Sequence, residues 1–258
     1  KARSIDELVF ILRLGKRVFP ILIIGSGSNI IVRDGGFKGI VIKLCGDFKE
    51  IKIDNTNLTL SVGAGTKDSE VSKFCLENEI SGLEFLSGIP GTIGGNLIMN
   101  AGCYGQKISD RLIDCTIIDK RLNIIRLKKS EINFGYRKSS FKNNQIIIGA
   151  RFKKNKIKKE NIKKIVSRIS SKRKQSQPVA NRTGGSTFTN PKSQSAWKLI
   201  DKINYRGKKL GGAKVSELHS NFLINDNNAT SLDLEMLGEE IRNNVWVKQK
   251  IKLHWELV

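Results

Sequence analysis

The sequence is poor in cysteine and histidine and has no long apolar run, and each shortage excludes a class of protein. No Cys-x-x-Cys pair occurs and only two histidines are present, so no zinc site or other metal site is expected. No apolar stretch approaches ~20 residues and no secretory signal pattern is visible, so no membrane partner is expected. Free thiols in a reducing compartment are the expected state of Cys45, Cys75, Cys103 and Cys115.

Acidic residues are also few: 24 Asp and Glu stand against 46 Lys and Arg, which gives a formal net charge of +22. Such a charge is compatible with nucleic-acid binding, because neutralised phosphates drive that affinity. The lysines are scattered, however, and the densest run, at 153–174, includes a helical pattern with a basic solvated face. We therefore expect no nucleic-acid partner, whereas an anionic small substrate fits the charge.

Apolar periodicity predicts interspersed helices and strands, which is the α+β class. The predicted helices lie at 4–14, 68–79, 160–174, 195–202 and 231–244. The predicted strands lie at 19–24, 30–32, 39–44, 51–53, 58–62, 112–118, 124–127, 146–152, within 216–225 and at 251–257. A polar loop is predicted at 177–191, and a composition shift near 153 predicts a domain boundary.

Two glycine-rich stretches follow apolar segments, at 25–29 and at 90–95. The first lacks the third glycine of a dinucleotide fingerprint, and neither ends in the Gly-Lys-Ser/Thr of a P-loop. Glycine lets backbone N–H groups approach an anion closely, and Ser26 and Ser28 add hydroxyl donors. Either stretch alone is as compatible with a tight turn, but together they favour two hairpin loops that form a pyrophosphate cradle.

An ordered set of motifs resembles the UDP-N-acetylenolpyruvoylglucosamine reductase family over essentially the whole chain. These motifs are IGSGSNIIVRDGGF at 24–37, EFLSGIPGTIGG at 84–95, NAGCYG at 100–105, FGYR at 134–137, GSTFTNP at 185–191, LGGAKVS at 210–216 and HWE at 254–256. Two departures are Ser26, where the family usually has glycine, and Cys103, where it commonly has alanine. The short segment between Arg137 and Lys153 is similar to the shorter subtype of the family.

The resemblance implies a two-lobed FAD-binding domain of the vanillyl-alcohol-oxidase type and a C-terminal α/β substrate-binding domain. The lobes are expected at 1–48 and 49–154, and the substrate domain at 155–258, with a C-terminal strand that returns to the active site. The chain opens at Lys1 almost directly in a helix, so an N-terminal piece of the first lobe is expected to be missing.

The implied reaction is the reduction of UDP-N-acetylglucosamine enolpyruvate to UDP-N-acetylmuramate for peptidoglycan synthesis, with FAD and NADPH. The resemblance implies a cytoplasmic enzyme, and a monomer is expected. Two alternatives remain open: another FAD-dependent oxidoreductase of the same superfamily, and a non-catalytic basic binding protein. Covalent flavin attachment through histidine is not expected, because His219 and His254 both lie outside the glycine stretches.

The resemblance assigns the catalytic roles to Arg137, Ser186 and Glu256. A guanidinium binds a carboxylate in a bidentate fork, a polarised hydroxyl donates a proton, and a buried carboxyl keeps one. From pattern alone each is also compatible with a structural role: a surface ion pair, a turn hydroxyl and a solvent-facing strand residue. Weaker candidates are Lys214 and Arg182 for the diphosphate, and Tyr136, Asn190 and His219 for the diphosphate or pyruvyl end of the substrate. The implied cofactor residues are Gly25, Ser26, Gly27, Ser28, Asn29, Pro90, Gly91, Thr92, Gly94, Gly95, Asn100 and Gly102.

Overall fold

The computed structural model describes residues 1–15 and 18–258 and divides the chain into two compact units. Unit 1 comprises residues 1–26 and 38–171, and unit 2 comprises residues 27–37 and 172–258. The first glycine-rich stretch is therefore shared, because Gly25 and Ser26 belong to unit 1 and Gly27 to Asn29 belong to unit 2. No helix in the described residues is long and apolar enough to cross a membrane.

Unit 1 begins with helix α1 (Ile5–Gly15) and a parallel strand pair, β1 (Ile21–Ile24) and β2 (Ile40–Lys43). Leu8 and Leu12, one helical turn apart, are buried, and acidic residues occupy the first turn, where the helix dipole favours them. The predicted helix and both strands are confirmed here with small shifts of their ends.

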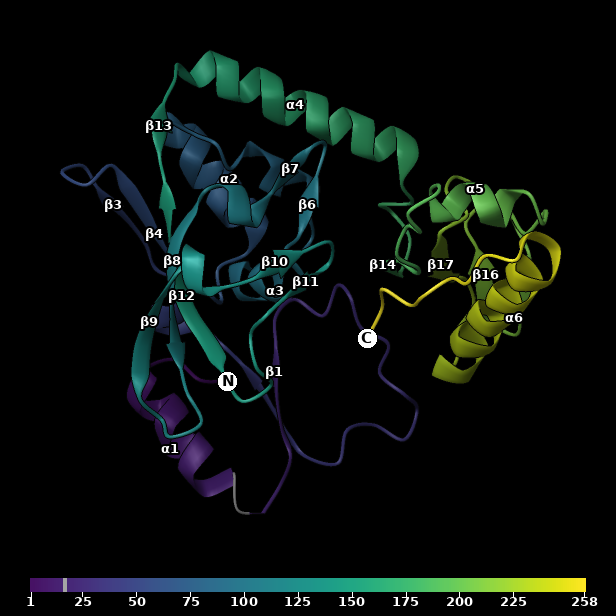
Figure 1. The fold of residues 1–258 in the computed structure, drawn as a ribbon, viewed down its shortest axis with the longest axis horizontal. Helices are drawn as coiled ribbons and strands as arrows, with labels where there is room; N and C mark the ends of the chain where they lie inside the picture. Colours follow the sequence, from purple (N-terminus) through teal and green to yellow (C-terminus); the bar gives the residue numbers. More distant parts are fainter. Residues whose placement is uncertain (16–17) are drawn as a thin grey trace. The chain divides into compact units, whose positions relative to one another are not determined.

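A five-stranded antiparallel sheet forms the centre of unit 1, in the order β3-β4-β12-β8-β9 (Figure 1). The strands are β3 (Ile51–Asp54), β4 (Thr59–Gly63), β8 (Leu112–Ile118), β9 (Ile124–Lys128) and β12 (Ile146–Lys153). Every one of these strands was predicted from the sequence, because each has the apolar, β-branched character of a half-buried strand. Buried Cys115 pairs with buried Ala150 across the middle of the sheet.

Short elements complete unit 1, and α2, α3 and the first three 3-10 turns contribute buried residues to the core of this sheet. The helices are α2 (Asp68–Glu77) and α3 (Ile93–Met99), and the 3-10 turns are η1 (Gly46–Lys49), η2 (Glu84–Gly88), η3 (Ile108–Asp110) and η4 (Lys129–Glu131). The short strands are β5 (Ile80–Ser81), β6 (Gly102–Cys103), β7 (Gln106–Lys107), β10 (Phe134–Gly135), β11 (Lys138–Ser139) and β13 (Asn155–Lys156). The basic helix α4 (Lys159–Ser176) buries only Ile162 and Ile169, so its lysines form the predicted solvated face.

Unit 2 contains a four-stranded antiparallel sheet in the order β14-β17-β16-β15, with helices α5 and α6 packed on it (Figure 1). Its strands are β14 (Thr183–Ser186), β15 (Lys209–Leu210), β16 (Ala213–Val215) and β17 (Phe222–Asn225), and its helices are α5 (Ala196–Asp201) and α6 (Ser231–Gln249). Leu199, Leu237 and Ile241 are fully buried in the core that these elements share.

Several sequence expectations are wrong in detail. The segment 30–32 is not a strand, and 251–257 contributes only an isolated bridge between Phe188 and Trp255. The predicted loop at 177–191 contains β14, which pairs with β17 despite its glycines. The second glycine-rich stretch is not a hairpin loop: Gly94 and Gly95 lie inside α3, since a helix start tolerates small residues as well as a turn does.

Candidate functional site

The two predicted glycine stretches meet within unit 1, at Gly25 and Thr92. Gly25 follows β1, and a β-carbon built on it would lie 2.5 Å from the Thr92 hydroxyl oxygen. Only glycine fits at this position without moving Thr92. The tertiary structure therefore brings the two stretches into contact at this point, and this contact explains why Gly25 has no side chain.

Backbone hydrogen bonds fix the second stretch onto the loop after β4. The N–H of Ile93 donates to the Thr66 carbonyl at 3.1 Å, and the N–H of Gly94 donates to the Ala64 carbonyl at 2.9 Å. The N–H of Gly94 is therefore used within the protein, and a β-carbon at this position would lie 3.2 Å from that of Ala64. Thr92 itself is buried and takes an extended conformation immediately before α3.

A buried carboxyl group, that of Asp68, lies directly behind this stretch. Its N–H donates to the Gly91 carbonyl at 3.2 Å, and its Oδ1 accepts a hydrogen bond from the Asn96 amide at 2.6 Å. Its Oδ2 would lie 2.8 Å from a β-carbon at Gly91 and accepts no hydrogen bond from any described residue. Burial raises the pKa of Asp68 to about 7, against the smaller lowering effect of the Asn96 hydrogen bond.

The remainder of the first stretch is held by the C-terminal segment of unit 2. The Val258 N–H donates to the Asn29 carbonyl at 3.1 Å, and the Asn29 amide donates to the Glu256 carbonyl at 2.9 Å. Gly27 takes a left-handed φ of 75°, whereas Ser26 does not take a positive φ. The serine in place of the family's usual glycine is thus accommodated without strain, because the conformational demand falls on Gly27.

Ser186 and Glu256 lie on neighbouring segments of unit 2. Ser186 ends β14, where it pairs with Phe222, and follows Gly185, whose φ of 94° requires glycine. The Glu256 N–H donates to the carbonyl of Thr187, the residue after Ser186, at 2.8 Å. The structure therefore places the segments of two of the three predicted catalytic residues side by side, although these residues are 70 positions apart in the sequence.

Trp255 fixes the segment that carries Glu256. Its indole N–H donates to Glu239 of α6 at 2.7 Å, and its ring lies 5.1 Å from that of buried Phe188. Glu256 is half-buried, between Trp255 and buried Leu257.

Arg137, the third predicted catalytic residue, belongs to unit 1. It stands in the two-residue turn between β10 and β11 and takes a left-handed φ of 54°. Its guanidinium lies 5.3 Å from the exposed ring of Tyr136, and its Nη1 donates to the Gly102 carbonyl at 3.3 Å. The predicted cofactor residue Gly102 therefore also orients the predicted carboxylate-binding arginine.

Asn100 links the same turn to the cofactor stretch. It is buried, takes a left-handed conformation after α3, and its amide donates to the Gly135 carbonyl at 2.9 Å. Its Oδ1 is buried and accepts no hydrogen bond from the described residues. A buried acceptor without a partner costs free energy, so this atom is suited to a donor group of a ligand.

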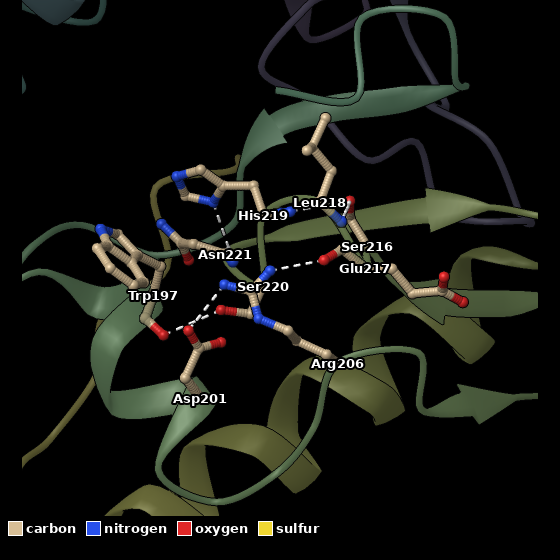
Figure 2. A network of polar contacts seen from close by, with 9 residues as sticks. All are labelled: Trp197, Asp201, Arg206, Ser216, Glu217, Leu218, His219, Ser220 and Asn221. Atoms are coloured by element: carbon tan, nitrogen blue, oxygen red, sulfur yellow. Dashed lines mark hydrogen bonds and ion pairs between the residues drawn. The ribbon is translucent and has the colours of Figure 1, made fainter. Parts of the chain in front are cut away.

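His219 lies in a polar network with Asp201, Arg206 and Ser220, shown in Figure 2. Its Nδ1 accepts a hydrogen bond from the Asn221 N–H at 3.3 Å, so the ring proton belongs on Nε2. Burial and the nearby Arg206 lower the pKa of His219, which favours the neutral ring. Arg206 itself is held by Asp201 at 2.7 Å and by the Glu217 carbonyl at 2.6 Å. His219 thus has both a structural contact and a donor atom.

Asn190 has a structural contact of its own, because its Oδ1 accepts the Ala196 N–H at 2.9 Å at the start of α5. With Lys192, Lys252 and His254 it lines a cavity of about 360 Å³ in unit 2. This basic lining suits a phosphate group.

Two weaker candidates for the diphosphate also lie in unit 2. Lys214 forms an ion pair with Glu217 at 2.7 Å. Arg182 and Gly27 line a second cavity, of about 290 Å³.

Comparison with known proteins decides the family. An FAD binding domain matches residues 1–128, and the C-terminal domain of UDP-N-acetylenolpyruvoylglucosamine reductase matches residues 177–258. A UDP-N-acetylenolpyruvoylglucosamine reductase of Rickettsia massiliae is 46% identical over 98% of this chain and 85% of its own length. This chain belongs to the UDP-N-acetylenolpyruvoylglucosamine reductase family. A second reductase of that name, from Rickettsia prowazekii, is 45% identical over 94% of this chain and 81% of its own length.

A solved reductase structure confirms the fold. The chain is similar to the UDP-N-acetylenolpyruvylglucosamine reductase of Thermus caldophilus, with a TM-score of 0.86 and 30% identity over 100% of this chain and 90% of that one. The expected FAD-binding domain and C-terminal reductase domain are thus confirmed, and the chain is a flavin-dependent oxidoreductase. The main interpretation of the sequence prevails over both alternatives.

FAD fits the residues present in unit 1. Gly25 presents bare backbone beside the Thr92 hydroxyl, and the buried Asn100 Oδ1 is available to a donor. Two residues near these groups were not among the predicted candidates: Asp68, which contacts Gly91 in the cofactor stretch, and Ser139, which contacts Ile98 in α3. From the sequence, Asp68 was interpreted only as the first residue of a helix. The only signal for Ser139 was its position, two residues after Arg137.

Proposed function

We propose that this protein catalyses the NADPH-dependent reduction of UDP-N-acetylglucosamine enolpyruvate to UDP-N-acetylmuramate. The observation that carries the proposal is the hydrogen bond from the Glu256 N–H to the Thr187 carbonyl, because it brings the segments of Glu256 and Ser186 side by side. A proton donor and a second acidic group on adjacent segments suit the protonation of a carbon next to a carboxylate. The names of the relatives and their identity to this chain support the same reaction.

When bound, FAD would supply the hydride chemistry that connects NADPH to the outer carbon of the enolpyruvyl group. The proposed holding residues in unit 1 are Gly25 and Ser26 together with Pro90, Gly91, Thr92, Gly94, Gly95, Asn100 and Gly102. Gly27, Ser28 and Asn29 are the proposed holding residues in unit 2. No histidine lies among them, and we propose that the flavin is held without a covalent bond.

Arg137 is proposed to bind the substrate carboxylate. Hydride addition to the outer carbon leaves negative charge on the inner carbon and its carboxylate. The guanidinium stays charged and presents paired N–H donors. It therefore stabilises the substrate more strongly after hydride addition, when the negative charge is larger, than before it.

Ser186 is proposed to donate the proton that the inner carbon needs. A serine hydroxyl is a weak acid in water, so neighbouring groups must stabilise the alkoxide as it forms. Glu256 is proposed to hold a proton against the enolate oxygen. The C–H bond formed at the inner carbon takes its hydrogen from the Ser186 hydroxyl, and the alkoxide regains a proton from solvent at the end of the cycle.

The diphosphate and the pyruvyl end of the substrate are assigned to Tyr136, Asn190 and His219. The Lys192 and Lys252 side chains around the Asn190 cavity supply positive charge for phosphate oxygens. His219 offers an Nε2–H from a neutral ring. We further propose flavin lobes at 1–48 and 49–154, a substrate domain at 155–258, and a monomeric cytoplasmic enzyme of peptidoglycan synthesis.

Replacement of Ser186 tests the proposal. In stopped-flow experiments, Ser186→Ala should bind FAD and be reduced by NADPH at the wild-type rate, because flavin reduction needs no proton at the substrate carbon. Reoxidation by UDP-N-acetylglucosamine enolpyruvate should fall by roughly 10²–10⁴-fold, the usual scale for a lost general acid. Ser186→Cys should retain more activity, since a thiol can still donate. Near wild-type reoxidation by the alanine variant would remove Ser186 from the proposal, and a protein that takes up no FAD would remove the proposal itself.

A further inference from the structure

The turn that carries Arg137 is tied to the segment 98–102 by side-chain hydrogen bonds. Two of these bonds involve the predicted site residues Asn100 and Arg137. A third comes from a residue with no assigned role: the Ser139 hydroxyl donates to the Ile98 carbonyl at 2.7 Å. Ser139 is half-buried and stands opposite Phe134 in the β10–β11 pair.

Arg137 needs this support because its backbone is strained. A left-handed φ of 54° is costly for a residue with a long side chain, on the order of 1–2 kcal/mol. Such conformations persist only where the surroundings impose them. The base of the hairpin is fixed by a 6.3 Å edge-to-face contact between Phe134 and Phe141, and the side facing α3 is fixed by the Ser139 hydrogen bond.

The partner of Ser139 lies on the helix that starts at the cofactor stretch. Ile98 belongs to the last turn of α3, whose first turn contains Gly94 and Gly95. The carbonyl groups of a last turn have no partner within the helix, so an outside hydroxyl can satisfy them. One short helix therefore connects the proposed flavin-binding glycines to the strand that follows Arg137.

We propose that Ser139 is a positioning residue, whose hydroxyl sets the place of the Arg137 turn relative to α3 and hence to the flavin. The inference rests on the proposed function for the role of Arg137 at the substrate carboxylate. Its simplest competitor is a purely structural role, in which Ser139 only satisfies the end of α3. The positioning role and the structural role predict different effects of removing the hydroxyl on flavin reduction by NADPH and on reoxidation by the substrate.

The adjacent Ser140 provides a matched control. Its hydroxyl accepts the Asn133 N–H at 2.9 Å, so it stabilises the same region without contacting α3. Ser139→Ala, Ser139→Thr and Ser140→Ala should be compared in the FAD-loaded protein by stopped-flow. Arg137→Lys should be measured with and without Ser139→Ala.

Ser139→Ala should slow flavin reoxidation by UDP-N-acetylglucosamine enolpyruvate by about tenfold, since small displacements of a positioned group cost up to ~10²-fold. Its reduction by NADPH should match that of Ser140→Ala, and Ser139→Thr should recover most of the loss. In the Arg137→Lys background the effect of Ser139→Ala should largely vanish, because the two changes act through one interaction. Hydrogen exchange should increase at 134–139 in Ser139→Ala and not in Ser140→Ala.

A wild-type rate of reoxidation in Ser139→Ala, or an equal fall in both half-reactions, would overturn the inference. So would a loss that simply adds to that of Arg137→Lys. A wild-type protein that is reduced by NADPH but not reoxidised by the substrate contradicts the proposed function instead, so the two failures are distinguishable.

Discussion

Trp255 packs against Gly238 of α6 so closely that a β-carbon at position 238 would overlap the indole ring. The same indole donates to Glu239 and contacts Phe188. Glycine inside a helix costs about 1 kcal/mol relative to alanine, so its presence here needs a reason. The reason is that the Trp255 indole occupies the space that a side chain at position 238 would need.

Gly238→Ala should therefore destabilise unit 2 even though alanine favours helices. Overpacking of this kind costs about 1–3 kcal/mol. Thermal denaturation should show a lower midpoint, and reoxidation by the substrate should slow more than reduction by NADPH. Gly35→Ala is the matched control, because no atom lies within 4 Å of a β-carbon at that position. A variant that is at least as stable as the wild type would show that Trp255 has room to move.

Gly25→Ala should weaken FAD binding, because the new methyl group would lie against the Thr92 hydroxyl in the cradle. The displacement should cost about 1–3 kcal/mol, which corresponds to roughly ten- to hundredfold in dissociation constant. Fluorescence titration of the apoprotein with FAD measures the effect. Thr92 is itself a proposed flavin contact, so Thr92→Ala should be measured alone and together with Gly25→Ala. The double change should cost less affinity than the sum of the two single changes, because the new methyl group no longer meets the Thr92 hydroxyl. Losses that simply add would place the cause elsewhere.

Arg137→Lys should impair turnover of the substrate far more than reduction of the flavin by NADPH. Lysine keeps the positive charge but loses the planar pair of donors and the bond to the Gly102 carbonyl. Stopped-flow separates the two half-reactions. An equal loss in both would assign Arg137 to structure or cofactor binding.

The stability of the protein should carry a pH dependence that comes from Asp68. Burial raises the pKa of its carboxyl to about 7, compared with about 3.9 in an unfolded chain. Between about pH 4 and pH 7 the folded protein holds this proton more tightly than the unfolded chain does. The contribution is therefore most favourable at the acid end of this window and falls as the pH rises towards 7.

Asp68→Asn cannot titrate and keeps a side chain of the same shape, so the variant should lack this fall. Its thermal midpoint at pH 8 should exceed that of the wild type. Asp119→Asn should have the opposite effect on stability. Hydrogen bonds, of which that from the Asn123 N–H is the most important, lower the pKa of Asp119. The charged carboxylate therefore stabilises the fold at pH values above the range in which it titrates, and Asp119→Asn removes this contribution. Wild-type and Asp68→Asn midpoints that run parallel between pH 5 and pH 8 would contradict the assignment.

The sequence by itself determined most element types and the family. The strands of the central sheet and the helices α1, α2, α4, α5 and α6 follow from local apolar patterns, which depend on neighbours in the chain. The ordered motifs likewise identified Arg137, Ser186 and Glu256 as candidates, because each motif is a continuous stretch.

Only the tertiary structure decided which of these stretches meet. The segment 30–32 has the composition of a strand, but its Ile31 N–H finds a single partner, the Val258 carbonyl, and no ladder forms. Three contacts join residues that are separated by 41 to 69 positions in the sequence: Gly25 with Thr92, Thr187 with Glu256, and Ser139 with Ile98. Hydrogen-bond partners and close packing at such separations depend on how whole elements pack, and a local pattern holds no information about the far side of the contact.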